Sequence, residues 1–310
     1  MRILIVGAGA VGGYFGGRLL EKGRDVTFLV RAKRQAQLAE TGLVVKSWLG
    51  DISLPVNTVL AEDVTAPYDL VVLSPKSYDL DGAIASVTKA VGPSSVVLPL
   101  LNGMNHLDVL DRHFGADRVL GGLCAIGATL NAEGHVQHLN KLHAIAFGER
   151  TAETSDRVKA ISEQFQDTIT AWRGSPIIIQ EMWEKWVFLS SLAGLTCLFR
   201  ASVGDILVAG GEQFAVEILG EAQAIATAFG YAARPDILAE HLRQLTLPGA
   251  PTTASMLRDI EKGSTTEAEH IIADLINRGQ SKGIATPRLS TALIHLRAYE
   301  ARRKRDASTQ

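Results

Sequence analysis

The pattern of hydrophobic and polar positions divides the 310-residue chain into two parts. Up to about residue 176, short apolar runs rich in β-branched residues alternate with helical segments, which is typical of a doubly wound parallel sheet. Beyond that point the pattern becomes helical almost throughout. The sequence therefore predicts an α/β protein with an N-terminal Rossmann domain, residues 1–176, and a C-terminal all-helical domain, residues 177–310, with the active site in the cleft between them. Residues 134–147 are expected to form a hairpin that closes the first domain.

A glycine-rich turn follows the first apolar run. Gly7-Ala8-Gly9-Ala10-Val11-Gly12 stands between a predicted strand and a predicted helix, the context in which G-x-G-x-x-G indicates dinucleotide binding. Gly7 allows the tight turn, Gly9 lets the backbone approach a pyrophosphate, and Gly12 lets the helix lie close to the strand. The helix N-terminus would offer its N–H groups and positive dipole end to the phosphates. A glycine-rich turn that binds nothing is the alternative, and this context disfavours it.

The end of the second predicted strand indicates which dinucleotide is bound. A site that prefers NAD places Asp or Glu there, to bind the ribose 2′-hydroxyl. This chain has Arg31 at that point, with Lys33 and Arg34 close behind, and Asp25 lies at the opposite end of the strand. A guanidinium suits a 2′-phosphate because it presents a rigid fork of donors. A solvated charge cluster is the alternative, and the sequence favours NADP as the cofactor.

Composition excludes some classes of protein but does not identify the function. The chain is 46% hydrophobic with a formal net charge of −2, so it shows no general bias toward nucleic acid or acidic membranes. The longest apolar stretch, residues 187–199, is too short to span a bilayer, and a strand that starts at residue 2 predicts that there is no signal peptide. Cys124 and Cys197 stand in apolar surroundings, which predicts a reduced cytoplasmic protein without disulfides.

Polar residues follow two further predicted strands. Lys76 comes after the apolar run 70–73, and Asn102 comes after the run 96–100. In doubly wound sheets ligands bind at the carboxyl ends of the strands. Both side chains are therefore candidates for the binding site.

Three histidines, His135, His138 and His143, raise the question of a metal site. Residues 135 and 138 would point to opposite faces of a strand, and no Asp or Cys completes a set of ligands. The sequence therefore predicts no bound metal.

Lys185 stands on an apolar face of the first helix in the second domain. At helical spacing it shares this face with Met182, Leu189, Leu192 and Ala193. Such a lysine usually extends its ammonium group to water. The alternative is a desolvated ammonium with a lowered pKa, able to protonate the alkoxide that forms when a hydride adds to a carbonyl. The residues alone leave both interpretations open.

Taken together, these features resemble the ketopantoate reductase (2-dehydropantoate 2-reductase) family. The resemblance covers essentially the whole chain and includes the glycine motif, Arg31, Lys76, Asn102-Gly103 and Glu184-Lys185. It continues from Thr196 to Leu207, where Arg200-Ala201-Ser202-Val203-Gly204-Asp205-Ile206-Leu207 is similar to the family's A-T-V-G-E-L stretch. It ends with Ser255-Met256-Leu257-Arg258-Asp259-Ile260 and Glu267, a pattern more specific than the glycines.

The resemblance implies a reaction and a role for each residue. The reaction would be the NADPH-dependent reduction of a small-molecule 2-keto acid, first of all 2-dehydropantoate to pantoate in pantothenate biosynthesis. Lys185 would be the general acid, and Ser255 would bind the substrate carboxylate. Asn102 and Glu267 would contact the nicotinamide ribose and the reaction centre. Lys76 and Ala128 would border the cofactor, and the family leaves a homodimer open.

Two of these residues also have a purely structural interpretation. Ser264-Thr265-Thr266-Glu267 is typical of a capping box at the start of a helix. Ser255 would otherwise be an ordinary serine in the first turn of a helix after Pro251.

The chain departs from the family at two positions. The family usually carries Asn four and eight residues after the catalytic lysine, and this chain has Leu189 and Ala193. Hydrocarbon thus replaces two amides that would hydrogen-bond substrate oxygens. This leaves open a reductase of a different, less polar 2-keto acid, or a cofactor-binding regulator that has lost catalysis. The joint presence of Lys185, Asn102, Ser255 and Glu267 favours the enzyme.

Overall fold

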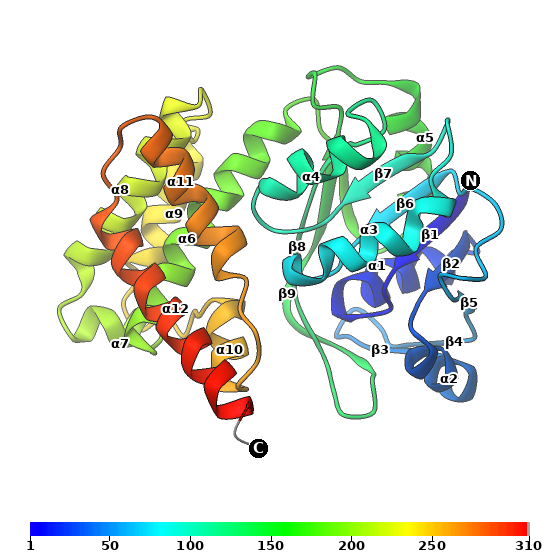
Figure 1. The fold of residues 1–310 in the computed structure, drawn as a ribbon, viewed down its shortest axis with the longest axis horizontal. Helices are drawn as coiled ribbons and strands as arrows, with labels where there is room; N and C mark the ends of the chain where they lie inside the picture. Colours follow the sequence, from blue (N-terminus) through cyan, green and yellow to red (C-terminus); the bar gives the residue numbers. More distant parts are fainter. Residues whose placement is uncertain (309–310) are drawn as a thin grey trace. The chain divides into compact units, whose positions relative to one another are not determined.

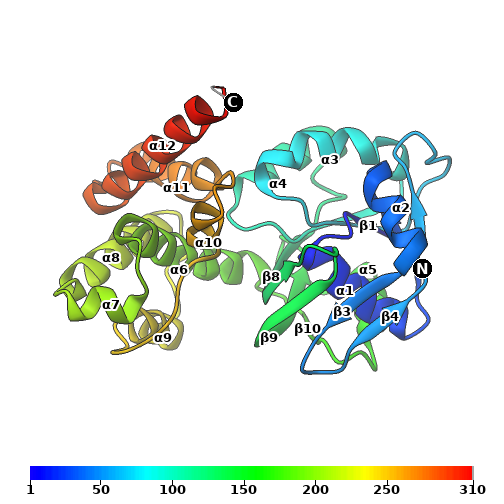
Figure 2. The same ribbon diagram turned by 90° about the horizontal axis from the view of Figure 1, so that it is seen from below.

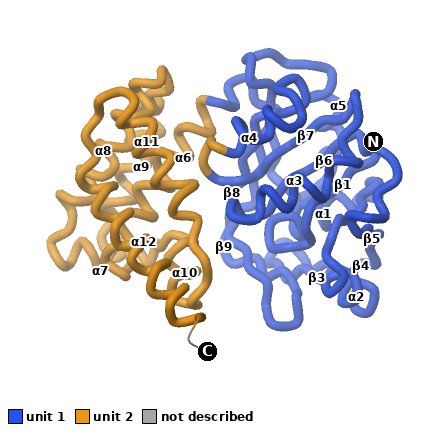
Figure 3. Tube along the Cα trace, viewed as in Figure 1, with its two compact units in different colours: residues 1–102, 106–179 blue, residues 103–105, 180–310 orange. Residues whose placement is uncertain are grey.

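The computed structural model describes residues 1–308 and divides into two compact units (Figure 3). Unit 1 comprises residues 1–102 and 106–179, and unit 2 comprises residues 103–105 and the chain from residue 180 onward. The main division falls after residue 179, whereas the hydrophobic pattern predicts it after residue 176. The transfer of the short segment 103–105 to unit 2 has no counterpart in the hydrophobic pattern.

Unit 1 is built on a five-stranded parallel sheet in the order β5-β2-β1-β6-β7 (Figure 1). The order reverses between β1 and β6, which confirms the predicted doubly wound sheet. Figure 2 shows α3 and α4 on one side of this sheet and α1 on the other. The strands are β1 (Arg2–Val6), β2 (Asp25–Leu29), β5 (Asn57–Val59), β6 (Leu70–Leu73) and β7 (Val96–Pro99), and the helices are α1 (Ala10–Glu21), α2 (Ala32–Thr41), α3 (Leu80–Val87), α4 (Asn105–Phe114) and α5 (Asp156–Phe165), with short turns η1 (Ser77–Asp79) and η2 (Thr88–Ala90).

A second sheet lies in the same unit, in the order β10-β9-β3-β4, with β8 paired to β9. Its strands are β3 (Leu43–Lys46), β4 (Ile52–Leu54), β8 (Gly121–Leu130), β9 (Val136–Gly148) and β10 (Ala171–Gly174). The predicted hairpin at 134–147 is wrong in extent, because these residues form mainly one long strand, β9, whose antiparallel partner is β8. Gly134 lies in the turn between them at φ +76°, and the Asn131 side chain accepts from the N–H of His135 at 2.8 Å.

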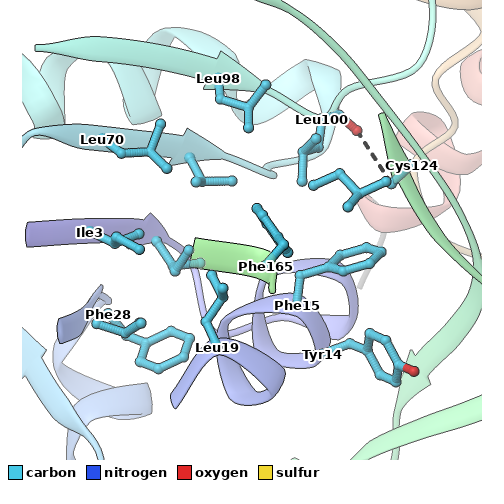
Figure 4. Packing of buried hydrophobic residues seen from close by; sticks show 14 of the residues in the cluster. Ile3, Tyr14, Phe15, Leu19, Phe28, Leu70, Leu98, Leu100, Cys124 and Phe165 are labelled. Atoms are coloured by element: carbon cyan, nitrogen blue, oxygen red, sulfur yellow. Dashed lines mark hydrogen bonds between the residues drawn. The ribbon is translucent and has the colours of Figure 1, made fainter. Parts of the chain in front are cut away.

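The core of unit 1 surrounds α1, as the packed side chains in Figure 4 show. A Cβ at Gly16 would lie 2.7 Å from the ring of Phe28 in the first sheet. A Cβ at Gly13 would lie 2.9 Å from Val136 in the second sheet. The helix therefore packs between the two sheets, and its glycines permit the close approach on both sides. Tyr14 and Phe15 fill the remaining space and are almost fully buried.

Unit 2 is helical, as predicted. Its central helix α6 is buried along most of its length, and its middle is half-buried only at Lys185, Phe188 and Leu189. A helix that is apolar nearly all round needs neighbours on every side. The helices are α6 (Ile178–Phe199), α7 (Val203–Val208), α8 (Glu212–Ala228), α9 (Pro235–Leu245), α10 (Ser255–Glu261), the π-helical turn η3 (Glu269–Ala273), α11 (Asp274–Ser281) and α12 (Pro287–Ala307). None of the helices between residues 1 and 308 is long and apolar enough to cross a membrane.

Candidate active site

The glycine motif adopts the geometry that its spacing predicts. Gly7 directly follows β1 at φ +91°, and its N–H donates to the carbonyl of Leu29 at 2.9 Å. A Cβ at Gly12 would overlap the carbonyl of Gly7 and lie 2.6 Å from Ser74 Oγ. A Cβ at Gly9 would meet no atom within 4 Å, so the space beside the N-terminus of α1 is open. This arrangement fits a pyrophosphate, because the first N–H groups of α1 have no partner within the helix.

The other predicted cofactor residues of unit 1 follow strands of the first sheet, with one exception. Arg31 comes two residues after β2 and is exposed, and Lys76 lies between β6 and η1. Asn102 comes three residues after β7. All three thus leave the carboxyl edge of the sheet that carries the glycine motif. Ala128 instead lies within β8, opposite His138 of β9.

Lys185 lies on the half-buried side of α6, and the carboxylate of the preceding residue, Glu184, stabilises the fold. The Glu184 side chain is 4% exposed and accepts from Arg234 Nε and Nη2 at 2.8 and 2.7 Å. Burial raises the pKa of the Glu184 carboxyl, but the hydrogen bonds from Arg234 outweigh it, so the pKa lies below its ordinary value. In the Glu184-Lys185 pair, Glu184 therefore attaches α6 to the start of α9.

Helix α6 also holds the segments that carry Glu267 and Ser255. The indole of Trp186, beside Lys185, donates to the carbonyl of Ile271 in the π-helical turn at 2.8 Å. Thr196 Oγ1 accepts from the N–H of Ala254, the residue before Ser255, at 3.2 Å. Lys185 and Thr196 are eleven residues apart, about three turns, and so share a face of the helix. The sequence assigns no role to Trp186 or Thr196, since a buried Trp or Thr carries no signal of its own.

On the face of α6 that carries Lys185, the stretch between these two attachments is apolar. Leu189 is half-buried, and Leu192 and Ala193 are 5% and 3% exposed. The nearby hydroxyls of Ser190 and Ser191 are fully buried and donate to carbonyls of α6 itself, at 2.8 Å to Trp186 and 2.7 Å to Val187. Both hydroxyl groups thus donate their protons within α6.

The capping-box interpretation of Glu267 is wrong. Helical residues begin only at Ala268, so Glu267 precedes the helix instead of occupying its third position. The N–H and hydroxyl of Thr266 both donate to Glu300 of α12, at 2.6 and 2.9 Å, and the carbonyl of Ser264 accepts from Tyr299 at 2.8 Å. A distant helix supplies the acceptor that a local cap would have provided. Ser255 is exposed and is the first residue of α10, as expected for a serine in a first turn.

A capping box does occur in the stretch similar to A-T-V-G-E-L. The Ser202 hydroxyl accepts from the N–H of Asp205, and the Asp205 side chain accepts from the N–H of Ser202. Gly204 lies between them, and a Cβ there would be 2.7 Å from the backbone of Gly249 and Ala250. This part of the motif therefore has a structural explanation in the start of α7.

His138 of β9 forms its hydrogen bonds with residues in or next to the second sheet. His138 bonds to Ser47 Oγ at 2.9 Å through Nδ1 and to the carbonyl of Leu142 at 2.7 Å through Nε2. Its ring packs on that of Tyr14, with centroids 4.8 Å apart. In the described residues, 1–308, no three His, Cys, Asp or Glu side chains are grouped so that they could hold a metal ion.

Two family profiles match the chain in succession. "Ketopantoate reductase PanE/ApbA" matches residues 3–152, and "Ketopantoate reductase PanE/ApbA C terminal" matches residues 177–300. The chain belongs to the ketopantoate reductase family. It is therefore an NADP-dependent type of oxidoreductase that acts on CH–OH groups, with a nicotinamide cofactor. The predicted family and enzyme class are confirmed.

Individual relatives agree in length and differ in what is known of them. "Uncharacterized oxidoreductase YkpB" of Bacillus subtilis (strain 168) is 38% identical over 302 residues, covering 97% of this chain and 99% of that protein. A crystal structure of 2-dehydropantoate 2-reductase from Geobacter metallireducens GS-15 is 29% identical, with a TM-score of 0.87 over 96% of this chain and 99% of the other. A ternary structure of D-mandelate dehydrogenase with NADH and anilino(oxo)acetate shares the fold at 21% identity, with a TM-score of 0.88 over 98% and 100% of the two chains.

Proposed function

We propose that this protein reduces a 2-keto acid to the 2-hydroxy acid with NADPH, and that 2-dehydropantoate, which would yield pantoate for pantothenate biosynthesis, is the first candidate substrate. The observation that carries the proposal is the arrangement around α6. The helix that bears Lys185 is hydrogen-bonded through Trp186 to the segment after Glu267 and through Thr196 to the segment of Ser255. One rigid element thus links the proposed general acid to both remaining candidate residues of unit 2.

The residues divide the chemistry between them. When bound, the nicotinamide cofactor supplies the hydride that adds to the carbonyl carbon of the substrate. Lys185 Nζ would donate a proton to the carbonyl oxygen, so that the alkoxide becomes a hydroxyl and the lysine is left neutral. Ser255 would donate its hydroxyl proton in a hydrogen bond to the substrate carboxylate. Asn102 and Glu267 would hold the nicotinamide ribose and the reaction centre.

The preference for NADPH rests on the end of β2. Arg31 is an exposed cation at the position where an acidic residue would bind the 2′-hydroxyl of NAD. Its guanidinium can donate two parallel hydrogen bonds to a phosphate. Arg31 is therefore assigned to the 2′-phosphate.

A less polar 2-keto acid is the second candidate substrate, and Leu189 favours it. Leu189 and Ala193 stand where amides are usual in the family, and the hydroxyls of Ser190 and Ser191 are engaged with α6. A buried substrate hydroxyl that met only these groups would lose its hydrogen bonds to water. The fold itself does not decide between substrates, since D-mandelate dehydrogenase shares it.

Consumption of NADPH with a panel of 2-keto acids tests the proposal. The panel contains 2-dehydropantoate, its deoxy analogue with a methyl group in place of the hydroxymethyl, and phenylglyoxylate. We expect turnover of at least one acid by the native protein and a kcat lower by about 10²–10⁴ for Lys185→Ala. A protein that binds NADPH but reduces no member of the panel would contradict the proposal.

A further inference from the structure

The cationic residues that follow β2 do not share one task. Arg31 is exposed, whereas Arg34, in the first turn of α2, is half-buried and directed at the glycine motif. Arg34 Nη2 and Nε donate to the carbonyl oxygen of Ala8 at 2.9 and 3.2 Å, and Nη1 donates to Gln37 Oε1 at 2.6 Å. The guanidinium thus binds the backbone carbonyl between Gly7 and Gly9, from the side of α2.

Its neighbours hold Arg34 in that orientation. Gln37 Nε2 donates to the carbonyl of Glu133, in the turn between β8 and β9. The next residue, Gly134, has φ +76°, and a Cβ there would lie 2.5 Å from Arg34 Nη1 and overlap Gln37 Nε2. The turn is therefore shaped to fit these two side chains, and the arginine has little freedom to swing toward the end of β2.

The bonds to Ala8 determine where the next N–H group points. The described chain has no cis peptide bond, so the Ala8–Gly9 peptide is trans. In a planar trans peptide the C=O and the following N–H point in opposite directions. With the Ala8 carbonyl turned toward Arg34, the N–H of Gly9 is turned away from α2. Gly9 is the N-cap of α1, and the space beside it is open.

The charge of Arg34 is available to an anion near this loop. Burial lowers the pKa of the Arg34 guanidinium, which nevertheless stays protonated at neutral pH. Within residues 1–308 no carboxylate forms an ion pair with it. A half-buried, uncompensated cation next to the loop favours a pyrophosphate through the low local dielectric.

We propose that Arg34 is a positioning residue of the pyrophosphate-binding loop, which orients the Gly9 N–H through the Ala8 carbonyl, and that it is not a ligand of the 2′-phosphate. This inference rests on the proposed binding of NADPH. It assigns each of the two neighbouring arginines to a different part of the dinucleotide. Arg31 serves the 2′-phosphate alone, and Arg34 serves the pyrophosphate that NADPH and NADH share.

Binding titrations of purified variants test this division. The probes are NADPH, NADH and adenosine 2′-monophosphate, which has the 2′-phosphate but no pyrophosphate. Arg34→Met removes the donors at similar length, and Arg34→Lys keeps the charge and can make one bond to the carbonyl. Arg24→Met is the matched control, because Arg24 also donates to backbone carbonyls, those of Gln164 and Gln166, but away from the glycine motif. Thermal unfolding of each variant shows that it is folded.

The expected result is a similar rise in Kd for both dinucleotides. Arg34→Met should weaken NADPH and NADH by the same factor, about tenfold, and leave adenosine 2′-monophosphate unchanged. Arg34→Lys should recover part of the loss, and Arg24→Met should bind all three probes as the native protein does. A loss confined to NADPH and adenosine 2′-monophosphate would overturn the inference, as would unchanged binding of both dinucleotides. A native protein that bound neither dinucleotide would overturn the proposed function as well.

Discussion

The guanidinium of Arg31 lies 3.5 Å from the carboxylate of Asp79, in the turn η1 that follows Lys76. The two side chains come from the carboxyl ends of β2 and β6, which are separated by β1 in the sheet. Both are well exposed, at 86% and 48%. The cation assigned to the 2′-phosphate is therefore shared with an anion of the protein itself. Cofactor choice should depend on the balance between them.

Removal of Arg31 should separate the two cofactors. One charge-assisted contact to the 2′-phosphate is worth about 1.5–3 kcal/mol, or roughly ten- to a hundredfold in Kd. Arg31→Ala should weaken NADPH by that factor and leave NADH nearly unchanged, as measured by fluorescence titration. NADH is the internal control, and an equal loss for both cofactors would contradict the assignment of Arg31.

Removal of Asp79 should act in the opposite direction. Asp79→Asn deletes a negative charge next to the site of a phosphate and frees Arg31 from its partner. Because both groups are exposed, the gain should be modest, about two- to fivefold in the Kd for NADPH. The gain should shrink at high salt, where such charges are screened. If NADPH binds Asp79→Asn no more tightly at low salt, the two residues do not compete for one site.

The pair of Glu184 and Arg234 should stabilise unit 2 in a pH-dependent way. Arg234→Met would leave a buried carboxylate without its cation, at a cost of about 2 kcal/mol, reduced from the usual buried-pair value because the Arg234 side chain is 42% exposed. The folded state lowers the pKa of Glu184. The stabilisation is therefore present above the ordinary carboxyl pKa and is lost as the pH falls through the lowered value.

Urea unfolding of both proteins at several pH values checks this prediction. The difference in unfolding free energy between native protein and Arg234→Met should be largest near neutral pH and narrow toward about pH 4, where Glu184 of the variant is protonated. The double variant Glu184→Gln with Arg234→Met should recover part of the loss, since no charge is then buried. A difference that does not vary with pH would show that Arg234 acts through packing alone.

The parts of the site that the sequence predicts depend on backbone requirements within a few residues. Gly7 needs a positive φ, and Gly12 leaves no room for a Cβ beside Gly7 and Ser74. Both requirements are met by glycine, so a sequence motif can specify them. The position of Arg31 after β2 follows equally from the local order of strand and helix. The fold class is predictable for the same reason, because alternating strands and helices give a doubly wound sheet.

The parts that the sequence does not predict depend on partners far along the chain. Thr266 is bonded by Glu300, thirty-four residues away, so a local capping box at Ser264 was the natural but wrong interpretation. Glu184 meets Arg234 at a separation of fifty residues. Arg34 carries the same charge as Arg31 and stands three residues later, yet it contacts the carbonyl of Ala8, which the local sequence does not reveal. No local pattern encodes such pairs.

The proposed role of Lys185 as proton donor can be tested by removing its side chain. Lys185→Ala should lower kcat by about 10²–10⁴ while the fold and the affinity for NADPH are kept. Lys304→Ala, an exposed lysine on α12 of the same unit, is the control and should turn over normally. Near-normal turnover by Lys185→Ala on the best substrate would mean that Lys185 is not the proton donor.

The apolar side chain of Leu189 should affect which substrate the protein prefers. A site that hydrogen-bonds a substrate hydroxyl discriminates strongly, because its polar groups lose their partner with the wrong ligand, whereas an apolar pocket has no such gain. A substrate hydroxyl buried against Leu189 without a partner would cost about 1–3 kcal/mol. The hydroxyls of Ser190 and Ser191 do not offset this cost, since both are fully buried and donate within α6.

We therefore expect kcat/KM for the deoxy analogue of 2-dehydropantoate to equal or exceed that for 2-dehydropantoate itself. Leu189→Asn should shift the ratio toward 2-dehydropantoate, because the amide can pair with its terminal hydroxyl. Leu189→Met is the control, since it keeps an apolar side chain of similar volume and should leave the ratio unchanged. A native preference for 2-dehydropantoate of a hundredfold or more would contradict the apolar pocket. Groups other than α6 would then bind the hydroxyl, and the chain would have the usual activity of its family despite Leu189 and Ala193.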